Sequence, residues 1–442
     1  MTNDDNKRQD DTGGMKMRRL FAITLTIAFI AAIMSGCIGS RKEEEKNNEK
    51  MPEPVFAPRP HVVVAIIDTG INPYHEVFSR PDETNHPSTW LEGFSEEIAA
   101  FELTFGDIYA DNYEADKDKW TNLKENELVW FTGTNVAAIS MQRDPVDSAY
   151  PVLDNGGHGT LVASSVLEAC PDAFIVSIQI ENDPDIVAAN EWAAKQPWID
   201  IVTTSWGKAP EEYAEETYMG LDKAQKLVHE AGKVQTNSAG NDPVPVTQDE
   251  HSGPSWNIAV GGALASDHGD AWIAAKFPDV VSDFWQDRLA KSGTVSGYRD
   301  AYGTSFSCPR VAGTLAKALY DIRAAVNYTG IITNNNLIET APGKGMLDDG
   351  KLTAGELRTA MNHSAIYWNV TDYTQNDTYF VPVLPGAPWV QMGWGYVNKT
   401  MAPTIAAVAL GNMPLPEKDP LAVAHNEALY ETRVQYWGNY PG

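Results

Sequence analysis

One stretch of the sequence combines a serine with the surroundings that a nucleophile needs. Ser305 follows Gly303-Thr304 and precedes a run whose apolar residues recur at helical spacing, so the serine is expected beside a helix N-terminus. The free N–H groups and the dipole of such a terminus favour negative charge, and attack on a carbonyl creates an oxyanion. An isolated glycine-threonine-serine is more often a simple helix cap. The catalytic interpretation therefore depends on the rest of the chain.

The helix after Ser305 is predicted from its proline and its apolar spacing. Pro309 is expected in the first turn, because proline lacks the N–H that a residue in a later turn donates. Val311, Leu315 and Leu319 recur at helical spacing, so one face of this helix should be buried.

Two further polar residues, Asp68 and His158, also stand at the ends of predicted elements. Asp68 comes directly after residues 62–67, a continuous apolar run typical of a parallel strand buried on both faces. Sites in open α/β sheets form at the carboxyl ends of the strands, where Asp68 would lie. His158 stands among glycines at the start of a predicted helix, so its ring should be accessible.

These three residues suit acyl transfer. His158 would take the proton of the Ser305 hydroxyl and return it to the leaving amine, while Asp68 would orient the imidazole and stabilise its charged form. The order Asp, His, Ser along the chain is one of the known orders of such triads. Asn241 follows a glycine at the end of a predicted strand. Its amide could donate to the oxyanion together with the Ser305 N–H.

Strands alternate with helices along most of the chain, which predicts an α/β fold with a doubly wound, mostly parallel sheet and helices on both faces. Further strands are expected at residues 174–180, 199–204, 233–238 and 258–261. Helices are expected at residues 186–194, from about 211 to a glycine at 232, and at 357–365 after a capping box formed by Thr353 and Glu356.

Residues 80–150 do not follow this alternation and are interpreted as a long insertion. The insertion is acidic and aromatic, and structural calcium is a candidate ligand for it. The spacing of its acidic residues matches no known calcium loop, so a solvated face is favoured and no metal ligand is assigned. The acidic residues concerned are Asp107, Asp111, Glu114, Asp116 and Asp118.

Five short blocks resemble the signature blocks of the subtilisin-like serine peptidases and occur in the order of that family. The blocks are Asp68-Thr69-Gly70-Ile71, His158-Gly159-Thr160, Ser205-Trp206-Gly207, Ala239-Gly240-Asn241 and Gly303-Thr304-Ser305-Phe306-Ser307-Cys308-Pro309. The resemblance covers about residues 61–410. It implies the subtilisin-like fold and a serine endopeptidase that acts on proteins or peptides and needs no cofactor for its chemistry.

The resemblance also implies roles for individual residues. Asp68, His158 and Ser305 would form the triad, and Asn241 would be the oxyanion residue. The family's substrate-binding edge and P1 pocket map onto a second set of positions. The edge would be Ser205, Trp206 and Gly207, and the pocket lining would be Ala239 and Gly240.

The first 60 residues predict export and tethering. Residues 1–39 combine a polar extension with a basic segment and an apolar run at 20–34, the pattern of a signal or anchor. Cys37 follows small residues, as in lipoprotein signals, so lipidation at Cys37 is predicted, with an uncleaved membrane anchor and plain secretion as alternatives. Residues 40–60 are charged and contain prolines, as a tether would. Residues 411–442 are a polar C-terminal tail without an assigned role.

Composition restricts the partners. The 442 residues include 33 basic and 60 acidic residues, a formal net charge of −27, which argues against nucleic acid. The three cysteines cannot form a disulfide framework. The sequence thus predicts an exported, surface-tethered serine endopeptidase at the cell surface. The alternatives are an inactive binding protein with the same fold and an esterase.

Overall fold

The computed structural model divides the chain into two units, residues 1–57 and 58–442, and every described residue belongs to the second. The structure describes residues 60–124, 126–141, 152–206, 215–241, 254–264, 272–273, 278–328, 336–339, 349–367, 381–382 and 386–438. The predicted signal, Cys37 and most of the tether lie outside the described residues. In the part that is described, no helix has the length and apolar character needed to cross a membrane.

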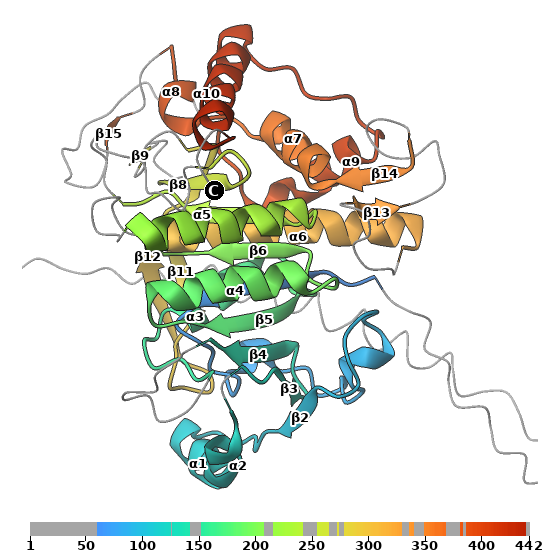
Figure 1. The fold of residues 1–442 in the computed structure, drawn as a ribbon, viewed down its shortest axis with the longest axis vertical. Coiled ribbons are helices and arrows are strands. Elements are labelled where there is room, and N and C mark those ends of the chain that lie inside the picture. Colours follow the sequence, from blue (N-terminus) through green and yellow to red (C-terminus); the bar gives the residue numbers. More distant parts are fainter. Residues whose placement is uncertain are drawn as a thin grey trace, which may run out of the picture. The chain divides into compact units, whose positions relative to one another are not determined.

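A nine-stranded sheet with the order β10-β8-β7-β6-β1-β5-β4-β3-β2 forms the centre of the second unit (Figure 1). Its neighbouring strands are parallel except for the antiparallel pair β3–β4. The predicted doubly wound, mostly parallel sheet is therefore confirmed. The strands are β1 (Val63–Asp68), β2 (Ala99–Glu102), β3 (Val129–Thr132), β4 (Val136–Ser140), β5 (Phe174–Gln179), β6 (Ile201–Thr204), β7 (Val234–Ser238), β8 (Ile258–Ala263) and β10 (Val280–Asp283).

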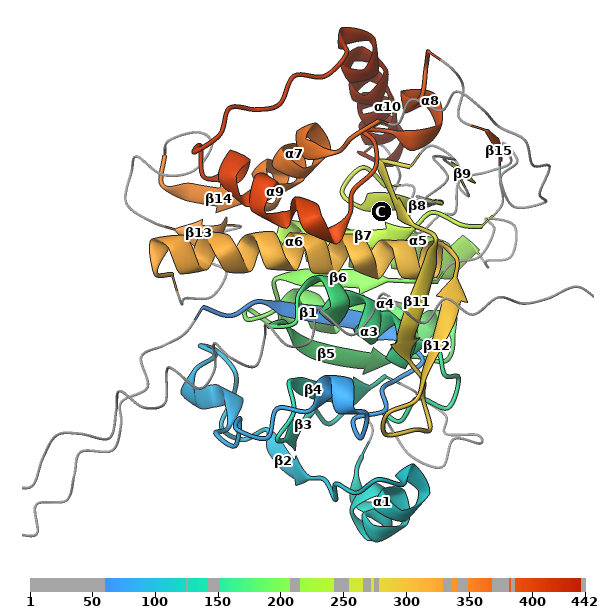
Figure 2. The ribbon, with the colours of Figure 1, turned by 180° about the vertical axis from the view of Figure 1, so that it is seen from behind.

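Helices cover both faces of this sheet. Alternate residues of β1 point to opposite sides, so Val64 and Ile66 join the core beneath α3 and α6, while Val63, Ala65 and Ile67 join the core beneath α4 and α5. Figures 1 and 2 show the two helical layers from opposite sides. The helices are α1 (Tyr109–Ala115), α2 (Lys117–Asn122), α3 (Gly159–Ala169), α4 (Asp183–Lys195), α5 (Glu215–Glu230), α6 (Thr304–Val326), α7 (Ala354–Ser364), α8 (Trp389–Met392), α9 (Ala402–Ala409) and α10 (Pro420–Gly438).

Smaller elements complete the unit. The hairpin of β11 and β12 leads directly into α6 and packs beside α3 (Figure 2). The strands outside the main sheet are β9 (Trp272–Ile273), β11 (Trp285–Ala290), β12 (Tyr298–Tyr302), β13 (Asn336–Glu339), β14 (Lys351–Thr353) and β15 (Val381–Pro382). The short 3₁₀ helices are η1 (Glu76–Phe78), η2 (Pro87–Thr89) and η5 (Lys399–Met401).

Residues 80–150 are more regular than the sequence predicts. This segment supplies β2, β3 and β4, which extend the main sheet beyond β5, and also α1 and α2. Asp116 is fully buried rather than part of a solvated face. Its carboxylate accepts hydrogen bonds from Thr104, Tyr74 and Lys119. These bonds satisfy the buried charge, which explains how an acidic residue can lie in a core.

The chain beyond residue 410 contains an ordered helix packed on the unit rather than only a polar tail. Asn426 of α10 donates to the Gly393 carbonyl at 3.0 Å. Arg433 lies buried against Asp279, which also pairs with Arg358 of α7. Each of these buried polar groups has a hydrogen-bond or ion-pair partner, so α10 is an integral part of the unit.

Candidate active site

The end of β1 and the start of α3 bring Asp68 and His158 together, as predicted. The Asp68 carboxylate is buried, and its two oxygens lie 2.8 and 3.0 Å from His158 Nδ1. One of these oxygens also accepts the Thr69 N–H at 2.8 Å. The His158 side chain is 32% exposed, so its other nitrogen can reach a substrate or a nucleophile. Because Nδ1 faces a carboxylate, it carries the proton, and Nε2 is left as the acceptor.

A backbone contact makes this pairing possible. Gly70 adopts φ +116°, and Gly159 lies directly against it. A Cβ on Gly159 would come within 2.2 Å of the Gly70 carbonyl oxygen, far inside any van der Waals contact. Glycine is required at both positions, because only residues without a Cβ let α3 approach β1 closely enough for His158 to reach Asp68.

Asp154 is a site residue that the sequence analysis missed. One carboxylate oxygen accepts the Thr69 hydroxyl and the Gly157 N–H at 2.7 Å each, and the other accepts the Thr160 N–H at 2.8 Å. Burial raises the pKa of Asp154, and the charge of Asp68 adds to this rise. The available signal was an aspartate shortly before a glycine-rich helix start, a pattern typical of side-chain capping. Asp154 therefore holds the loop that carries the histidine.

Ser305 lies in the first turn of α6. Gly303, with φ +129°, precedes the helix, which begins at Thr304. At this position the Ser305 N–H has no helical acceptor, as an oxyanion donor requires. The predicted place of Pro309 is wrong: it lies inside α6 rather than in its first turn, because Gly303 starts the helix earlier. Since proline lacks an N–H, the Ser305 carbonyl loses its helical donor.

The loop after β7 places Asn241 beside the start of α6. Asn241 Oδ1 accepts the Thr304 N–H at 2.8 Å and lies 3.0 Å from the Thr304 hydroxyl. A backbone N–H only donates, so the amide orientation is fixed and Nδ2 remains available as a donor. The Thr304 hydroxyl also lies 3.1 Å from the Gly240 carbonyl, and Ala239 is buried just before it. The Asn241 and P1-pocket candidates thus adjoin Ser305.

The candidate substrate edge also adjoins Ser305. Ser205 follows β6, and its carbonyl accepts the Ser305 hydroxyl at 3.1 Å. Trp206 is half-buried and packs against the core beneath α4 and α5. Gly207 lies outside the described residues.

The two halves of the site meet through Phe306. Its ring centroid lies 5.5 Å from that of His158. No hydrogen bond joins Ser305 to His158, although both residues are described; the Ser305 hydroxyl donates to the Ser205 carbonyl instead. Catalytic hydrogen bonds of unliganded enzymes are often absent or long and form in the substrate complex.

The electrostatics of the site act on the histidine. Burial opposes the charged imidazole, but the carboxylate of Asp68 outweighs burial and raises the pKa of His158, while Arg299 opposes the rise. Among the residues that the structure describes, no group of three or more His, Cys, Asp or Glu side chains could hold a metal ion. Cys308 is buried beside Thr203 and has a pKa raised by burial to about 11, so it remains a thiol.

Comparison with known proteins identifies the family. The profile of the subtilase family matches residues 59–376, well over half of the chain. The chain belongs to the subtilase family. It is a serine endopeptidase with the α/β subtilisin-like fold. A search of curated proteins finds no significant match.

Several solved structures are similar to this subtilase. Fervidolysin of Fervidobacterium pennivorans is 17% identical, with a TM-score of 0.45, over 82% of this chain and 44% of that one. The prenylagaramide maturation protease PagA is 17% identical, with a TM-score of 0.43, over 79% of this chain and 95% of that one. A cold-adapted subtilisin-like serine proteinase is 18% identical, with a TM-score of 0.39, over 74% of this chain and 89% of that one.

The raised pKa of His158 predicts the pH dependence of activity. The imidazole accepts a proton only in its neutral form, so kcat/KM should rise along an acid limb centred above the ordinary value of 6.5. In Asp68→Asn the limb should move to lower pH, and kcat should fall by about 10⁴-fold. Steady-state rates over about pH 5–9 measure both effects. A wild-type limb at or below the ordinary value would contradict this electrostatic interpretation.

The contact between Gly70 and Gly159 predicts the effect of one methyl group. Gly159→Ala must separate α3 from β1, and a displacement of about 1 Å at the site should lower kcat by about 100-fold. Gly157→Ala is the matched control. Gly157 has φ +73° but no atom within 4 Å of the added Cβ, so the substitution adds only backbone strain of about 1–2 kcal/mol. Equal losses of kcat in the two variants would show that the close contact is unimportant.

Proposed function

We propose that this subtilase hydrolyses peptide bonds through a triad of Asp68, His158 and Ser305. The observation that carries the proposal is the Asp68–His158 contact at the carboxyl end of β1, beside the first turn of α6 that presents Ser305. This arrangement fixes the tautomer of the imidazole and leaves the serine N–H available for an oxyanion.

The proposed reaction has two stages. In the first, Ser305 Oγ attacks the substrate carbonyl while His158 Nε2 takes its proton. The tetrahedral oxyanion would accept hydrogen bonds from the Ser305 N–H and from Asn241 Nδ2. The intermediate then expels the amine, which takes the proton from His158, and an acyl-enzyme remains. In the second stage, water attacks the acyl-enzyme while His158 takes its proton, and the acid is released as Ser305 regains its hydroxyl proton.

The residues around Ser305 support a mode of substrate binding. The backbone at Ser205 and Trp206 follows β6 at the site edge, where an extended substrate could pair with it as a further strand. The carbonyl of Ser205 already lies 3.1 Å from the nucleophile. Ala239 and Gly240 would line the P1 pocket. Proteins or peptides are therefore the proposed substrates, with no cofactor in the chemistry and no nucleic acid as partner.

The proposed location is the cell surface. The sequence around Cys37 supports export followed by lipidation, with residues 40–60 as a tether between the lipid and the enzyme.

The chemical proposal predicts different losses at two residues. Ser305→Ala should abolish turnover and labelling by a fluorophosphonate probe, because the nucleophile is gone. Asn241→Ala should lower kcat by about 10²–10³-fold with little change in KM, since its bond forms mainly in the transition state. Kinetics with matched peptide and ester substrates measure these effects.

The outcomes separate the alternatives. A folded wild type that neither cleaves peptides nor takes up the probe would be an inactive binding protein. A wild type that turns over only the ester would be an esterase. A large rise in KM with unchanged kcat in Asn241→Ala would remove this residue from the oxyanion site.

The location predicts the behaviour of a single thiol variant. Cys37→Ser should release the protein from the membrane, because the lipid can no longer attach. Fractionation before and after a carbonate wash measures the release, with the wild type as the control. A variant that still sediments with membranes would show that the apolar segment itself is the anchor.

A further inference from the structure

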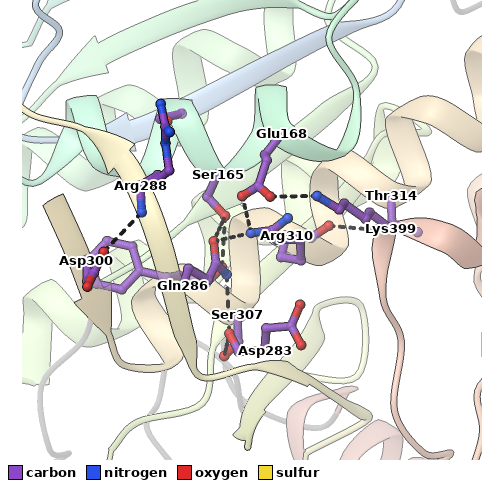
Figure 3. Close-up of polar contacts among 12 residues, drawn as sticks. Ser165, Glu168, Asp283, Gln286, Arg288, Asp300, Ser307, Arg310, Thr314 and Lys399 are labelled. Carbon is purple, nitrogen blue, oxygen red and sulfur yellow. Dashed lines mark hydrogen bonds and ion pairs between the residues drawn. The ribbon is translucent and has the colours of Figure 1, made fainter. Parts of the chain in front are cut away.

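We propose that a buried polar cluster centred on Arg310 holds helix α3 against helix α6 and thereby sets the separation of His158 and Ser305. The cluster, here called the Arg310 cluster, consists of the side chains of Ser165, Glu168, Gln286 and Arg310 and the carbonyl of Phe306. Figure 3 shows the four side chains. This role rests on the proposed triad, and it makes Arg310 a positioning residue rather than a catalytic one.

The two catalytic side chains lie at the ends of two packed helices. His158 caps α3, and Ser305 is the second residue of α6. The helices touch at Gly313, where a Cβ would lie 2.4 Å from the Val166 carbonyl oxygen. Eight residues separate this contact from each catalytic residue, about 12 Å along a helix, so a rotation of about 5° would move either side chain by about 1 Å. The site is therefore sensitive to small rotations about this contact.

Gln286, on β11, joins the two helices between the contact and the site. Its Oε1 accepts the Ser165 hydroxyl from α3 and Nη2 of Arg310 from α6, each at 2.7 Å. Its Nε2 donates to the carbonyls of Phe306 and Asp283, at 2.7 and 3.2 Å. Arginine only donates and carbonyls only accept, so the amide has one orientation with all its bonds made. Such a group resists rotation of either helix.

Arg310 supplies the charge that holds the cluster. Its side chain is only 4% exposed, and Nη2 lies 2.5 Å from Glu168 Oε2 on α3. Burial opposes the charge of Glu168, but its bonds to Arg310 and Lys399 outweigh burial and lower its pKa. The pair therefore stays ionised. A buried cation that loses its partner is strongly unfavourable, so the ion pair resists separation of the helices.

The cluster reaches the nucleophile through one peptide unit. Phe306 follows Ser305, and its carbonyl accepts from Gln286 Nε2 at 2.7 Å and also lies 3.1 Å from the Ser165 hydroxyl. Pro309 deprives the Ser305 carbonyl of its helical donor, so the first turn of α6 has one internal bond fewer. The bond from Gln286, which lies outside the helix, holds this turn at the Phe306 carbonyl in place of the lost internal bond. The ring of Phe306 also contacts His158.

The test compares two arginines of the same helix. Arg310→Met removes the centre of the cluster. Arg323→Met is the matched control, because Arg323 is also buried on α6 and paired, with Asp200 at 2.7 and 2.8 Å, but lies 18 residues beyond Ser305. Both variants should lower Tm. Only Arg310→Met should lower kcat, by about 10–100-fold, with KM within about twofold of wild type.

The readouts separate positioning from stability. Rates are expressed per site titrated with the fluorophosphonate probe, so that unfolded protein does not count. The acid limb of kcat/KM should stay at its wild-type pH, because Arg310 contacts neither Asp68 nor His158. Should Arg310→Met fail to fold, Glu168→Gln at a 38% exposed position should still fold and lower kcat by about 3–10-fold.

Two results would overturn the proposal. One is a titrated kcat within twofold of wild type in Arg310→Met, or in Glu168→Gln where the first variant does not fold. The other is an equal loss of kcat in Arg323→Met, which would make the effect a general consequence of destabilising α6. Ser305→Ala, assayed in parallel, tests the triad separately: activity that survives in it would remove the proposed function itself.

Discussion

The contact of two backbones, at Gly70 and Gly159, is the constraint on which the first half of the site depends. Neither position has room for a side chain, since a Cβ on either would lie within 3 Å of main-chain oxygen. The contact places the residue before α3 next to the last residue of β1. Asp68 and His158 can then share a hydrogen bond without any distortion of strand or helix. Asp154 and Thr69 hold the intervening loop, so the site is organised before substrate arrives.

The order of the strands brings the other residues to the same edge. β1 lies between β5 and β6, so the chain passes from one side of β1 to the other between these two strands. Ligand sites of open α/β sheets form at such a switch point, beyond the carboxyl ends of the strands. Asp68 is the last residue of β1, and Ser205 and Asn241 come shortly after β6 and β7, so the three residues lie at the ends of neighbouring strands. Residues more than 170 positions apart therefore meet, and α6 completes the site from one face.

The sequence predicted the elements whose signal is local. The expected strand at residues 62–67 is β1, whose continuous run of apolar, mostly β-branched residues favours a strand buried on both faces, and the expected strand at residues 174–180 is β5. Thr353 and Glu356 form the expected capping box because both partners lie within four residues. The triad candidates followed from the same logic, since each stands at the end of such an element. The structure brings Asp68 and His158 into contact and places Ser305 nearby, with Phe306 against His158.

What could not be predicted depends on contacts between distant residues. Strands of four or five residues, such as β3 and β4, carry too short a pattern to be distinguished within an acidic segment. Asp116 can be buried because Tyr74, 42 residues earlier, donates to it. Pro309 lies inside α6 because the helix already begins after Gly303, whose positive φ angle cannot be read from the sequence pattern. Arg310 likewise looks like an ordinary helix residue until Glu168 is placed opposite it.

The hydrogen bond between Ser305 and the Ser205 carbonyl bears on whether the site is active. A neutral hydrogen bond of this kind contributes about 0.5–1.5 kcal/mol net, so it favours this rotamer over its alternatives by roughly 2–13-fold. Loss of this bond, when the Ser305 hydroxyl rotates towards His158, therefore costs far less free energy than the reduction of the activation barrier by an enzyme, which is typically about 8 kcal/mol or more. A substrate strand that pairs along the edge at Ser205 would compete for the same carbonyl and release the hydroxyl. The observed rotamer is thus compatible with an active peptidase in its unliganded form, and it gives no reason to prefer an inactive binding protein.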